Sequence, residues 1–327
     1  MFNLPLRVGL IGCGGIAPTH LRAYQRSGMA QVVAVADVDA RRAAALAEQA
    51  DATAYENYLD MLEKERLDAV SVLTPPAWHR AITEVALAAG VHVLCEKPLA
   101  TTAVDARAMA EAAQRSGRLL VAQCHRFHEP VRRARDLIQA GDLGELLTYR
   151  NRFSYLRGTP DEITRGRGGV LLDNGSHASY IFRFLLGEVE SAFGWARAEQ
   201  LSRIEDLCVC TLILESAATA GVIELDGAAK PCPNVIEVFG DKGAIVIDYD
   251  TGKSRFHPAS GEPVSLDDPT LPSGHRFDRE VAHFLHCILG DEEPTIGAEE
   301  GVTDLLVLEA CYQSMTTGRK VHLEQSR

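Results

Sequence analysis

The sequence predicts two domains of different fold class. Residues 1–124 are expected to form an α/β domain built on a doubly wound parallel sheet, and residues 125–327 an α+β domain with a mainly antiparallel open sheet. Three observations favour this division. Short β-branched runs alternate with helical segments before residue 124, strand-like runs follow one another after it, and 327 residues exceed what one hydrophobic core usually holds.

In the N-terminal part, five continuous apolar runs predict strands that are buried on both faces, as in a parallel sheet covered by helices. Gly90 and Gly117 follow two of the intervening helical segments, where a left-handed cap is expected. The strands are expected at 7–11, 31–36, 68–73, 91–95 and 119–124, and the helices near 16–27, 40–49, 56–65, 77–89 and 102–116.

After residue 124, a helix near 130–140 that ends at Gly141 precedes strands without intervening helices. The turn at 240–243, which begins and ends with glycine, favours antiparallel pairing. Helices near 276–289 and 301–317 close the chain, and the Pro/Gly-rich stretch 257–274 is expected to be a loop. The strands are expected at 146–155, 192–198, 207–215, 218–225, 234–239 and 244–248.

The composition excludes several classes of function. A net charge of -12 argues against general binding of nucleic acid or of an anionic membrane surface. No apolar run approaches 18 residues and no signal peptide is evident, so we expect a cytoplasmic protein without a membrane partner. The eight cysteines form no C-x-x-C pair, and Cys208 and Cys210 point the same way along a strand as small hydrophobic residues, so no metal site is expected.

A glycine fingerprint follows the first expected strand. Gly12, Gly14 and Ala17 fit G-x-G-x-x-A, the pattern of a Rossmann domain that places a dinucleotide pyrophosphate on a helix N-terminus. Asp37 ends the second strand, where a carboxylate can bind the adenine ribose hydroxyls and repel a 2'-phosphate, which favours NAD over NADP. Asp37 also fits a solvated acidic residue after a strand, and Arg41 and Arg42 leave NADP open.

Three further motifs lie at expected strand ends or beyond them. Thr74, Pro75 and His79 form a T-P-x-x-x-H turn, the next strand ends in an E-K-P turn at 96–98, and a D-x-G-x-H motif covers 173–177. With the glycine fingerprint, and in this order, they resemble the glucose-fructose oxidoreductase, inositol dehydrogenase and rhizopine catabolism group, the Gfo/Idh/MocA family. The resemblance covers essentially the whole chain.

The resemblance implies an NAD(P)-dependent dehydrogenase or reductase acting on a secondary hydroxyl or ketone of a sugar, cyclitol or related polyol. His177 is similar to the family's general acid/base, Asp173 to its partner, and Lys97 to the cation at the reacting oxygen, with a cis bond after Lys97. By the same resemblance, the cofactor contacts are Gly12, Cys13, Gly14, Gly15, Ile16, Asp37, Leu73, Thr74, Pro75, His79, Glu96 and Lys97, and the substrate contacts are Lys97, Arg126, Tyr155, Asp173 and His177. It also implies a homo-oligomer, a dimer or tetramer, formed through the open sheet.

Each proposed role has an alternative. Asp173 or Ser176 would equally cap a helix beginning near His177. His177 would equally be a residue under that helix whose hydrogen bonds are satisfied, and Lys97 a surface residue beside a turn. At the level of function, the alternatives are a dinucleotide-binding sensor and an NAD-dependent hydrolase or lyase that oxidises a sugar only transiently. In the family, the third residue after the histidine is often Asp and two arginines commonly follow the sixth strand, so Tyr180 and His125 are departures that bear on the substrate.

A basic cluster lies close to the D-x-G-x-H motif. Its members on the expected strand at 146–155, Arg150 and Arg152, share one face, with Asn151, Phe153 and Tyr155 on the other. A solvated loop or subunit contact is the preferred interpretation, and a cationic lid for a substrate carboxylate or phosphate is the alternative. The cluster consists of Arg150, Arg152, Arg157, Arg165 and Arg167.

Overall fold

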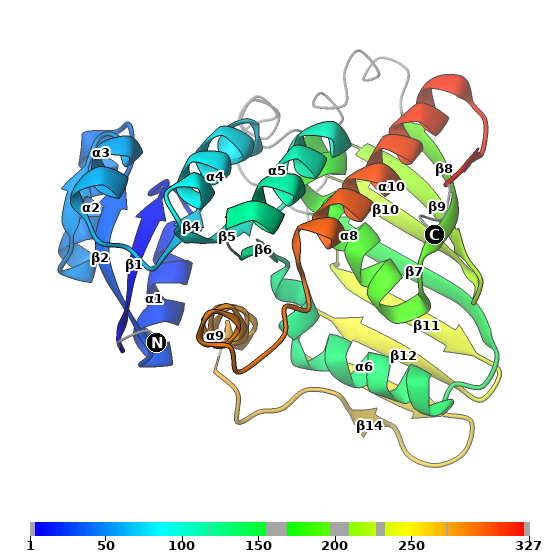
Figure 1. The fold of residues 1–327 in the computed structure, drawn as a ribbon. Coiled ribbons are helices and arrows are strands. Elements are labelled where there is room, and N and C mark those ends of the chain that lie inside the picture. Colours follow the sequence, from blue (N-terminus) through cyan, green and yellow to red (C-terminus); the bar gives the residue numbers. More distant parts are fainter. Residues whose placement is uncertain are drawn as a thin grey trace. The chain divides into compact units, whose positions relative to one another are not determined.

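The computed structural model describes residues 4–116, 118–154, 169–196, 209–226, 233–272 and 274–323 (Figure 1). The chain divides into two compact units, the first made of Met1–Cys124 and Ser273–Thr303, the second of His125–Pro272 and Asp304–Arg327. The sequence analysis assigned all of 125–327 to one domain. The difference is due to helix α9 (His275–Leu289), which packs along α1 (Ala17–Ser27) and buries its apolar face in the core of the first unit.

The first unit contains a six-stranded parallel sheet in the order β3-β2-β1-β4-β5-β6, which confirms the predicted fold class. The strand order reverses between β1 and β4, and ligands of such sheets bind at the carboxyl ends of the strands beside this switch point. Only β3, three residues long, was not predicted. The bounds are β1 Leu6–Ile11, β2 Ala30–Ala36, β3 Thr53–Tyr55, β4 Ala69–Val72, β5 His92–Glu96 and β6 Leu119–Ala122.

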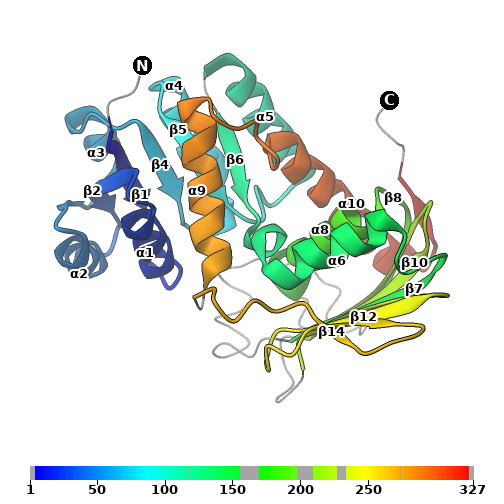
Figure 2. The same cartoon turned by 90° about the horizontal axis from the view of Figure 1, so that it is seen from below.

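Helices cover both faces of this sheet. Figure 2 shows α1 and α9 side by side across one face, where they share a buried cluster with side chains of α2 and of the central strands. The connections through α3, α4 and α5 return along the other face, as right-handed crossovers require. Gly90 follows α4 with φ 77°, the left-handed cap that the sequence predicts, whereas Gly117 lies outside the described residues. These helices are α2 Ala40–Ala50, α3 Tyr58–Lys64, α4 His79–Ala88 after the short η1 Pro76–Trp78, and α5 Ala103–Ser116.

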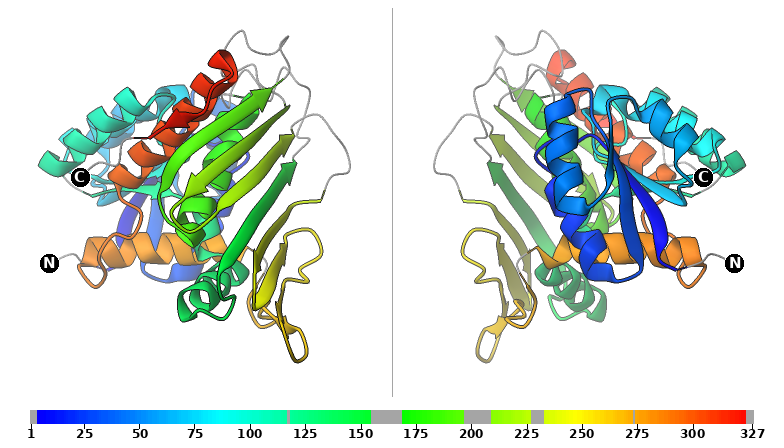
Figure 3. Two further views of the ribbon diagram at one scale, coloured as in Figure 1. Left: turned by 90° about the vertical axis from the view of Figure 1, so that its right-hand side faces the viewer. Right: turned by 90° about the vertical axis from the view of Figure 1, so that its left-hand side faces the viewer.

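The second unit contains a nine-stranded sheet in the order β14-β13-β12-β11-β7-β10-β9-β8-β15 (Figure 3, left). All neighbouring strands are antiparallel except β7 and β10. Two short strands, β13 and β14, lie within or next to the segment 257–274, where the sequence analysis expected only a loop. The bounds are β7 Leu146–Ser154, β8 Val189–Ala196, β9 Val209–Ser216, β10 Ala220–Asp226, β11 Val235–Gly240, β12 Gly243–Asp248, β13 Arg255–Pro258, β14 Val264–Ser265 and β15 Val321–His322.

Helix α8 (Gly169–Leu186) packs on β10, β9 and β7, and was not predicted as a helix of this length. It lies beside α6 (Glu129–Ala140), which follows the short η2 (Cys124–Phe127) and ends at Gly141 as expected, with φ 80°. Helix α10 (Ala298–Thr317) completes the described helices. Within the described part of the chain, no helix is long and apolar enough to cross a membrane.

Candidate active site

The glycine loop joins the end of β1 to the start of α1. Gly12 has φ 97°, and a Cβ atom on it would lie 2.8 Å from both the carbonyl carbon and the carbonyl oxygen of Leu73. A side chain at position 12 would therefore collide with backbone that cannot move aside, and only glycine fits. The loop is thereby held against the residues that follow β4 at the carboxyl edge of the sheet.

The rest of the loop is open. Cβ atoms built on Gly14 and Gly15 would meet no protein atom within 4 Å, and Ile16 at the N-cap of α1 provides no side-chain hydrogen bond to the helix. An uncapped helix N-terminus beside two bare backbone positions suits a phosphate group, because its N–H groups and the helix dipole attract anions.

Asp37 is fixed beside this loop by backbone donors. The N–H of Cys13 donates to Asp37 Oδ2 at 2.7 Å, and the N–H of Asp39 donates to Asp37 Oδ1 at 2.8 Å. Burial, and then the charge of Asp37, raise the pKa of the Cys13 thiol to about 12, so this thiol stays protonated. The carboxylate that the sequence predicts to bind the ribose therefore has a defined position at the carboxyl end of β2.

The two basic residues that left NADP open are engaged at the start of α2. Arg41 Nη2 lies 3.3 Å from Asp39 Oδ2, and Arg42 Nε lies 3.8 Å from the same oxygen. Both arginine side chains are largely exposed, and Asp39 is the N-cap of α2. These contacts provide a structural role for both arginines that involves no cofactor.

His79 connects the two turns that carry the other motifs of the first unit. It is fully buried, with Nε2 2.8 Å from the Thr74 carbonyl oxygen and Nδ1 3.0 Å from that of Pro98. Burial lowers the pKa of His79, although the two carbonyl oxygens oppose this. The ring nitrogens of His79 thus hold the two turns together, and its contact with the cofactor stays a prediction. The Lys97-Pro98 bond is cis, as the resemblance implies.

Glu96 at the end of β5 is held on both carboxylate oxygens. Oε1 lies 3.1 Å from His20 Nε2 on α1, and Oε2 accepts from the backbone N–H of Lys97 at 3.0 Å. Burial raises the pKa of Glu96, but the bond from His20 and the charge of Lys97 outweigh this and leave the pKa below its usual value. Glu96 is therefore ionised in the first unit.

A second buried carboxyl lies on α9. Glu280 is 2% exposed, and neither of its oxygens has a hydrogen-bond partner among the described residues. Burial raises its pKa well above the ordinary 4.5, the charge of Glu96 raises it further, and Arg276 opposes both. The carboxyl group of Glu280 is therefore protonated in the folded protein.

This proton makes the stability of the first unit depend on pH. Because the folded state holds a proton that the unfolded chain releases above about pH 4.5, the free energy of unfolding falls by about 1.4 kcal/mol per pH unit above that value, until the folded pKa is passed. Glu280→Gln lacks this penalty. Urea unfolding at pH 4, 6 and 8 should show the variant gaining stability over the wild type as the pH rises. An equal difference at all three values would mean that Glu280 is ionised in the fold.

In the second unit, α8 carries Asp173 and His177 on one face, one turn apart. All the remaining residues from Gly169 to Arg183 are buried, so within this stretch only Asp173 and His177 keep access to solvent. Since α8 begins at Gly169, neither Asp173 nor Ser176 caps it, and the alternative of a helix starting near His177 is wrong. The Ser176 hydroxyl donates instead to the Asp173 carbonyl oxygen at 2.9 Å, inside the helix.

The ring of His125 packs against His177, and rings from two further segments pack against His125. The His125 ring, on η2, has its centroid 4.3 Å from that of His177 in an edge-to-face arrangement. His125 Nδ1 lies 2.9 Å from the hydroxyl of Tyr249, which directly follows β12, and Phe153 of β7 contacts both rings. The sequence analysis noted His125 only as a departure from the family pattern and gave no signal for Tyr249.

Arg126, the predicted substrate contact, binds the same helix. Its Nη1 donates to the Tyr180 hydroxyl at 2.9 Å, and its guanidinium lies 4.6 Å from the centroid of the Phe184 ring. Tyr180 is 2% exposed, so the residue that stands where the family often has Asp is a buried, neutral partner for this arginine. Tyr155, the remaining predicted substrate contact, lies outside the described residues.

Two models of one protein family match the chain. The first, described as an oxidoreductase family with an NAD-binding Rossmann fold, matches residues 6–123, and the second, described as the C-terminal alpha/beta domain of the oxidoreductase family, matches residues 135–323. The chain belongs to the Gfo/Idh/MocA family. Like the characterised members that it resembles, it is an NAD(P)-dependent oxidoreductase acting on CH-OH groups.

Individual members of the Gfo/Idh/MocA family match over nearly the whole chain. A D-apiose dehydrogenase of Paraburkholderia graminis is 28% identical over 96% of this chain and 89% of its own length. A dTDP-3,4-didehydro-2,6-dideoxy-alpha-D-glucose 3-reductase of Saccharopolyspora spinosa is 30% identical over 96% of this chain and 98% of its own. The crystal structure of the WlbA dehydrogenase of Bordetella pertussis, in complex with NADH and UDP-GlcNAcA, shares the fold with a TM-score of 0.87, at 24% identity and full coverage of both chains.

The residues of the glycine loop fit the dinucleotide that this family uses. The space over Gly14 and Gly15, the uncapped start of α1 and the fixed carboxylate of Asp37 suit a pyrophosphate and a ribose diol. The first unit contains the NAD-binding Rossmann domain of this family, which the family model matches over residues 6–123.

Two members of the arginine cluster, Arg150 and Arg152, lie within the residues that the structure describes. Arg157, Arg165 and Arg167 lie outside the described residues. Arg150 and Arg152 share the exposed face of β7, with Asn151 and Phe153 buried on the other, as the alternation predicts. Arg152 Nε lies 2.9 Å from Glu224 Oε2, and the Arg150 guanidinium lies over the Phe239 ring. Arg150 and Arg152 therefore lie on the exposed face of a strand and not in a loop, and the interpretations as a subunit contact or a cationic lid both stay predictions.

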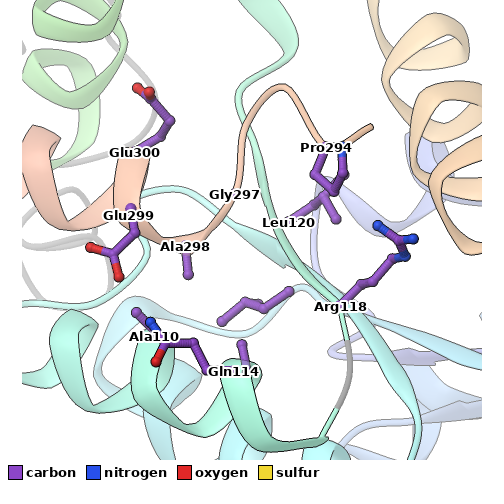
Figure 4. Close-up of a pocket in the computed structure, with 11 residues that line it drawn as sticks. Ala110, Gln114, Arg118, Leu120, Pro294, Gly297, Ala298, Glu299 and Glu300 are labelled. Carbon is purple, nitrogen blue, oxygen red and sulfur yellow. The ribbon is translucent and has the colours of Figure 1, made fainter. Parts of the chain in front are cut away.

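A cavity of about 300 Å³ lies at the amino end of β6 in the parallel sheet (Figure 4). It is bordered by the end of α5, the start of β6 and the first turn of α10, so it lies at the amino ends of the strands and not beside the glycine loop. No residue predicted for the site lines it. Among the described residues, no group of three or more His, Cys, Asp or Glu side chains is arranged to hold a metal ion.

Proposed function

We propose that this enzyme interconverts a secondary hydroxyl group and a ketone on a sugar, cyclitol or related polyol, with His177 as the general acid/base. The observation that carries the proposal is the exposure of Asp173 and His177 on an otherwise buried stretch of α8. A carboxylate and an imidazole that keep solvent access one helical turn apart suit proton transfer better than packing.

The proposed roles follow from the chemistry of alcohol oxidation. His177 takes the proton of the reacting hydroxyl in oxidation and returns it in reduction, since an imidazole can do either near neutral pH. Asp173 orients the imidazole and stabilises its protonated form. The ammonium of Lys97 holds the reacting oxygen as negative charge develops on it. Arg126, fixed by Tyr180, and Tyr155 contribute further substrate contacts.

The cofactor is held by this chain's first unit. Bound NAD supplies the hydride acceptor, and reduced NAD the donor. We assign the pyrophosphate to the loop from Gly12 to Ile16, with the ribose hydroxyls bound by Asp37. Leu73, Thr74 and Pro75, with Glu96, border the nicotinamide end, while His79 supports the two turns from within.

A cofactor-reduction screen tests the proposal. Inositols, sugars and sugar acids are offered with NAD and NADP in parallel, and the absorbance of the reduced cofactor and the products are both measured. Net reduction of NAD supports the proposal. Bond cleavage without net reduction would assign the protein to the hydrolases or lyases that oxidise a sugar transiently, and NAD binding without turnover of any substrate would make it a sensor.

Asp37 provides a test of cofactor choice. Asp37→Ala removes a charged acceptor worth about 1.5–3 kcal/mol, so the affinity for NAD should fall by about 10-fold or more while that for NADP falls less. Titration of the purified protein with each cofactor measures both. Asp39→Asn, which keeps the N-cap of α2, is the control and should leave NAD affinity within about threefold. An unchanged NAD titration in Asp37→Ala would remove Asp37 from the cofactor site.

We also propose that the exposed face of the nine-stranded sheet pairs with the same face of a second copy, giving a dimer or a tetramer. Ile213 is 37% exposed and lies in register with Val222 of β10 and Phe193 of β8, in a row beside Trp195, which is 57% exposed. Such an apolar row across an open sheet is typical of a subunit contact.

Ile213→Asp tests this contact. The charge should convert the oligomer to monomers in light scattering after size exclusion, because a buried unpaired carboxylate disfavours association. Val104→Asp on α5, at a position 75% exposed, is the matched control and should leave the mass unchanged. If the Ile213 variant keeps the wild-type mass, this face does not form the contact.

A further inference from the structure

We propose that His125 and Tyr249 are positioning residues for His177: the bond between them fixes the His125 ring, and the His125 ring in turn fixes the His177 imidazole. The inference rests on the role proposed for His177 above. It adds two residues, 124 positions apart in the chain, to which no motif assigns a part in the reaction.

The His125 ring lies directly against the His177 ring. The centroids of His125 and His177 are 4.3 Å apart with the ring planes at 60°, so an edge of one ring lies against the other. His125 is 2% exposed and is packed by Phe153 at 5.6 Å and Tyr249 at 5.1 Å, measured between centroids. His177 thus has a buried, tightly packed ring on one side and solvent access on the other.

The hydrogen bond between Tyr249 and His125 fixes the orientation of the His125 ring. Packing alone restricts a ring to its plane but does not distinguish its two flipped orientations, because χ2 of histidine is broad and roughly two-fold. The Tyr249 hydroxyl, 2.9 Å from His125 Nδ1, removes this ambiguity, since the flipped ring would present a carbon to the hydroxyl. The ring atoms that His125 presents to His177 are therefore always the same.

Tyr249 is itself held in place. It directly follows β12, its backbone N–H donates to the Asn234 carbonyl oxygen at 3.0 Å, and the His128 ring stacks on its phenol at 4.8 Å. The positions of His177, His125 and Tyr249 are thus set by α8, η2 and the turn after β12. A catalytic imidazole displaced by about 1 Å can lose about 100-fold in rate, which is the effect that this arrangement prevents.

The first test is Tyr249→Phe, which keeps the ring and removes only the hydroxyl. We expect kcat to fall by about 10-fold with KM changed by less than about twofold, because the substrate still binds but the base is less well aligned. Tyr149→Phe is the matched control, since it removes a buried phenol hydroxyl in the same unit that bonds Asn151 and not the site. It should leave kcat unchanged.

Variants of His125 separate positioning from packing. His125→Leu should lower kcat by about 100-fold, and His125→Asn, whose amide nitrogen can replace Nδ1 towards Tyr249, should lose less. Because Tyr249 acts only through His125, the double variant His125→Leu, Tyr249→Phe should be no slower than His125→Leu alone. Additive losses would overturn the proposal.

The His177→Ala background distinguishes failure of this inference from failure of the proposed function. If His177→Ala retains near-normal turnover, the proposed function fails. If it is slow and Tyr249→Phe slows it a further 10-fold, the function stands but the inference is wrong, since Tyr249 would then act without His177. The expected result is that Tyr249→Phe has no effect in this background.

Discussion

Replacing His177 with alanine is expected to lower kcat by about 100- to 10,000-fold, the range typical of a lost general acid/base. The affinity for NAD should stay within about twofold, because the glycine loop and Asp37 belong to the other unit of the chain. Steady-state turnover with the substrate found by the screen measures the first quantity, and an NAD titration followed by protein fluorescence measures the second.

The control for this variant is Ser179→Ala on the same helix. Ser179 is fully buried, and its hydroxyl donates to the Ser176 carbonyl oxygen at 3.4 Å within α8, so its removal tests the effect of a small change in the helix itself. Turnover of this variant should be close to that of the wild type. If His177→Ala and Ser179→Ala were equally active, His177 would have no part in the chemistry.

The parallel sheet of the first unit could be predicted because its signals are local. A buried strand, a glycine loop and an amphipathic helix each occupy a short continuous segment, and Gly12 and Asp37 could be assigned by their distance from a strand end. The short β3, with the sequence Thr-Ala-Tyr, has no such pattern. It is a strand only because β2 offers it an edge to pair with.

Helix α8 escaped prediction for the opposite reason. An amphipathic helix is recognised by its polar face, but from Gly169 to Arg183 only two positions are not buried, so the hydrophobic period is missing. The sequence suggested a helix here only in the alternative in which Asp173 or Ser176 caps a helix beginning near His177. The four-residue spacing of the D-x-G-x-H motif has a different meaning inside a helix, where it places Asp173 and His177 on one face.

The surroundings of His177 could not be predicted from one sequence. Nothing local to Tyr249 distinguishes it from other tyrosines in turns, and its bond to His125 depends on the pairing of β12 in the sheet of the second unit. The same holds for Tyr180, which the sequence showed only as a departure from the family pattern. Its role as the partner of Arg126 emerges only from the packing of η2 against α8.

Replacing Asp304 with alanine is expected to lower the free energy of unfolding of the second unit by about 3–5 kcal/mol. Asp304 Oδ1 lies 2.8 Å from Arg183 Nη1, and the two side chains are 5% and 4% exposed. The pair joins α10 to α8, the helix that carries Asp173 and His177. Removing the carboxylate leaves the buried Nη1 of the guanidinium without this partner, and the desolvation of the guanidinium is no longer compensated by Asp304.

The same arginine offers a matched control on its other side. Glu188 accepts from Arg183 Nε at 2.8 Å and Nη2 at 3.0 Å, but it is 58% exposed, so Glu188→Ala should cost only about 0.2–1 kcal/mol. Urea unfolding followed by the fluorescence of Trp195, in a Trp78→Phe background, reports on the second unit alone. Equal losses in the two variants would show that burial does not decide the strength of this pair. A large loss in Asp304→Ala alone would identify the contact between α10 and α8 as a main support of the helix that bears the proposed base.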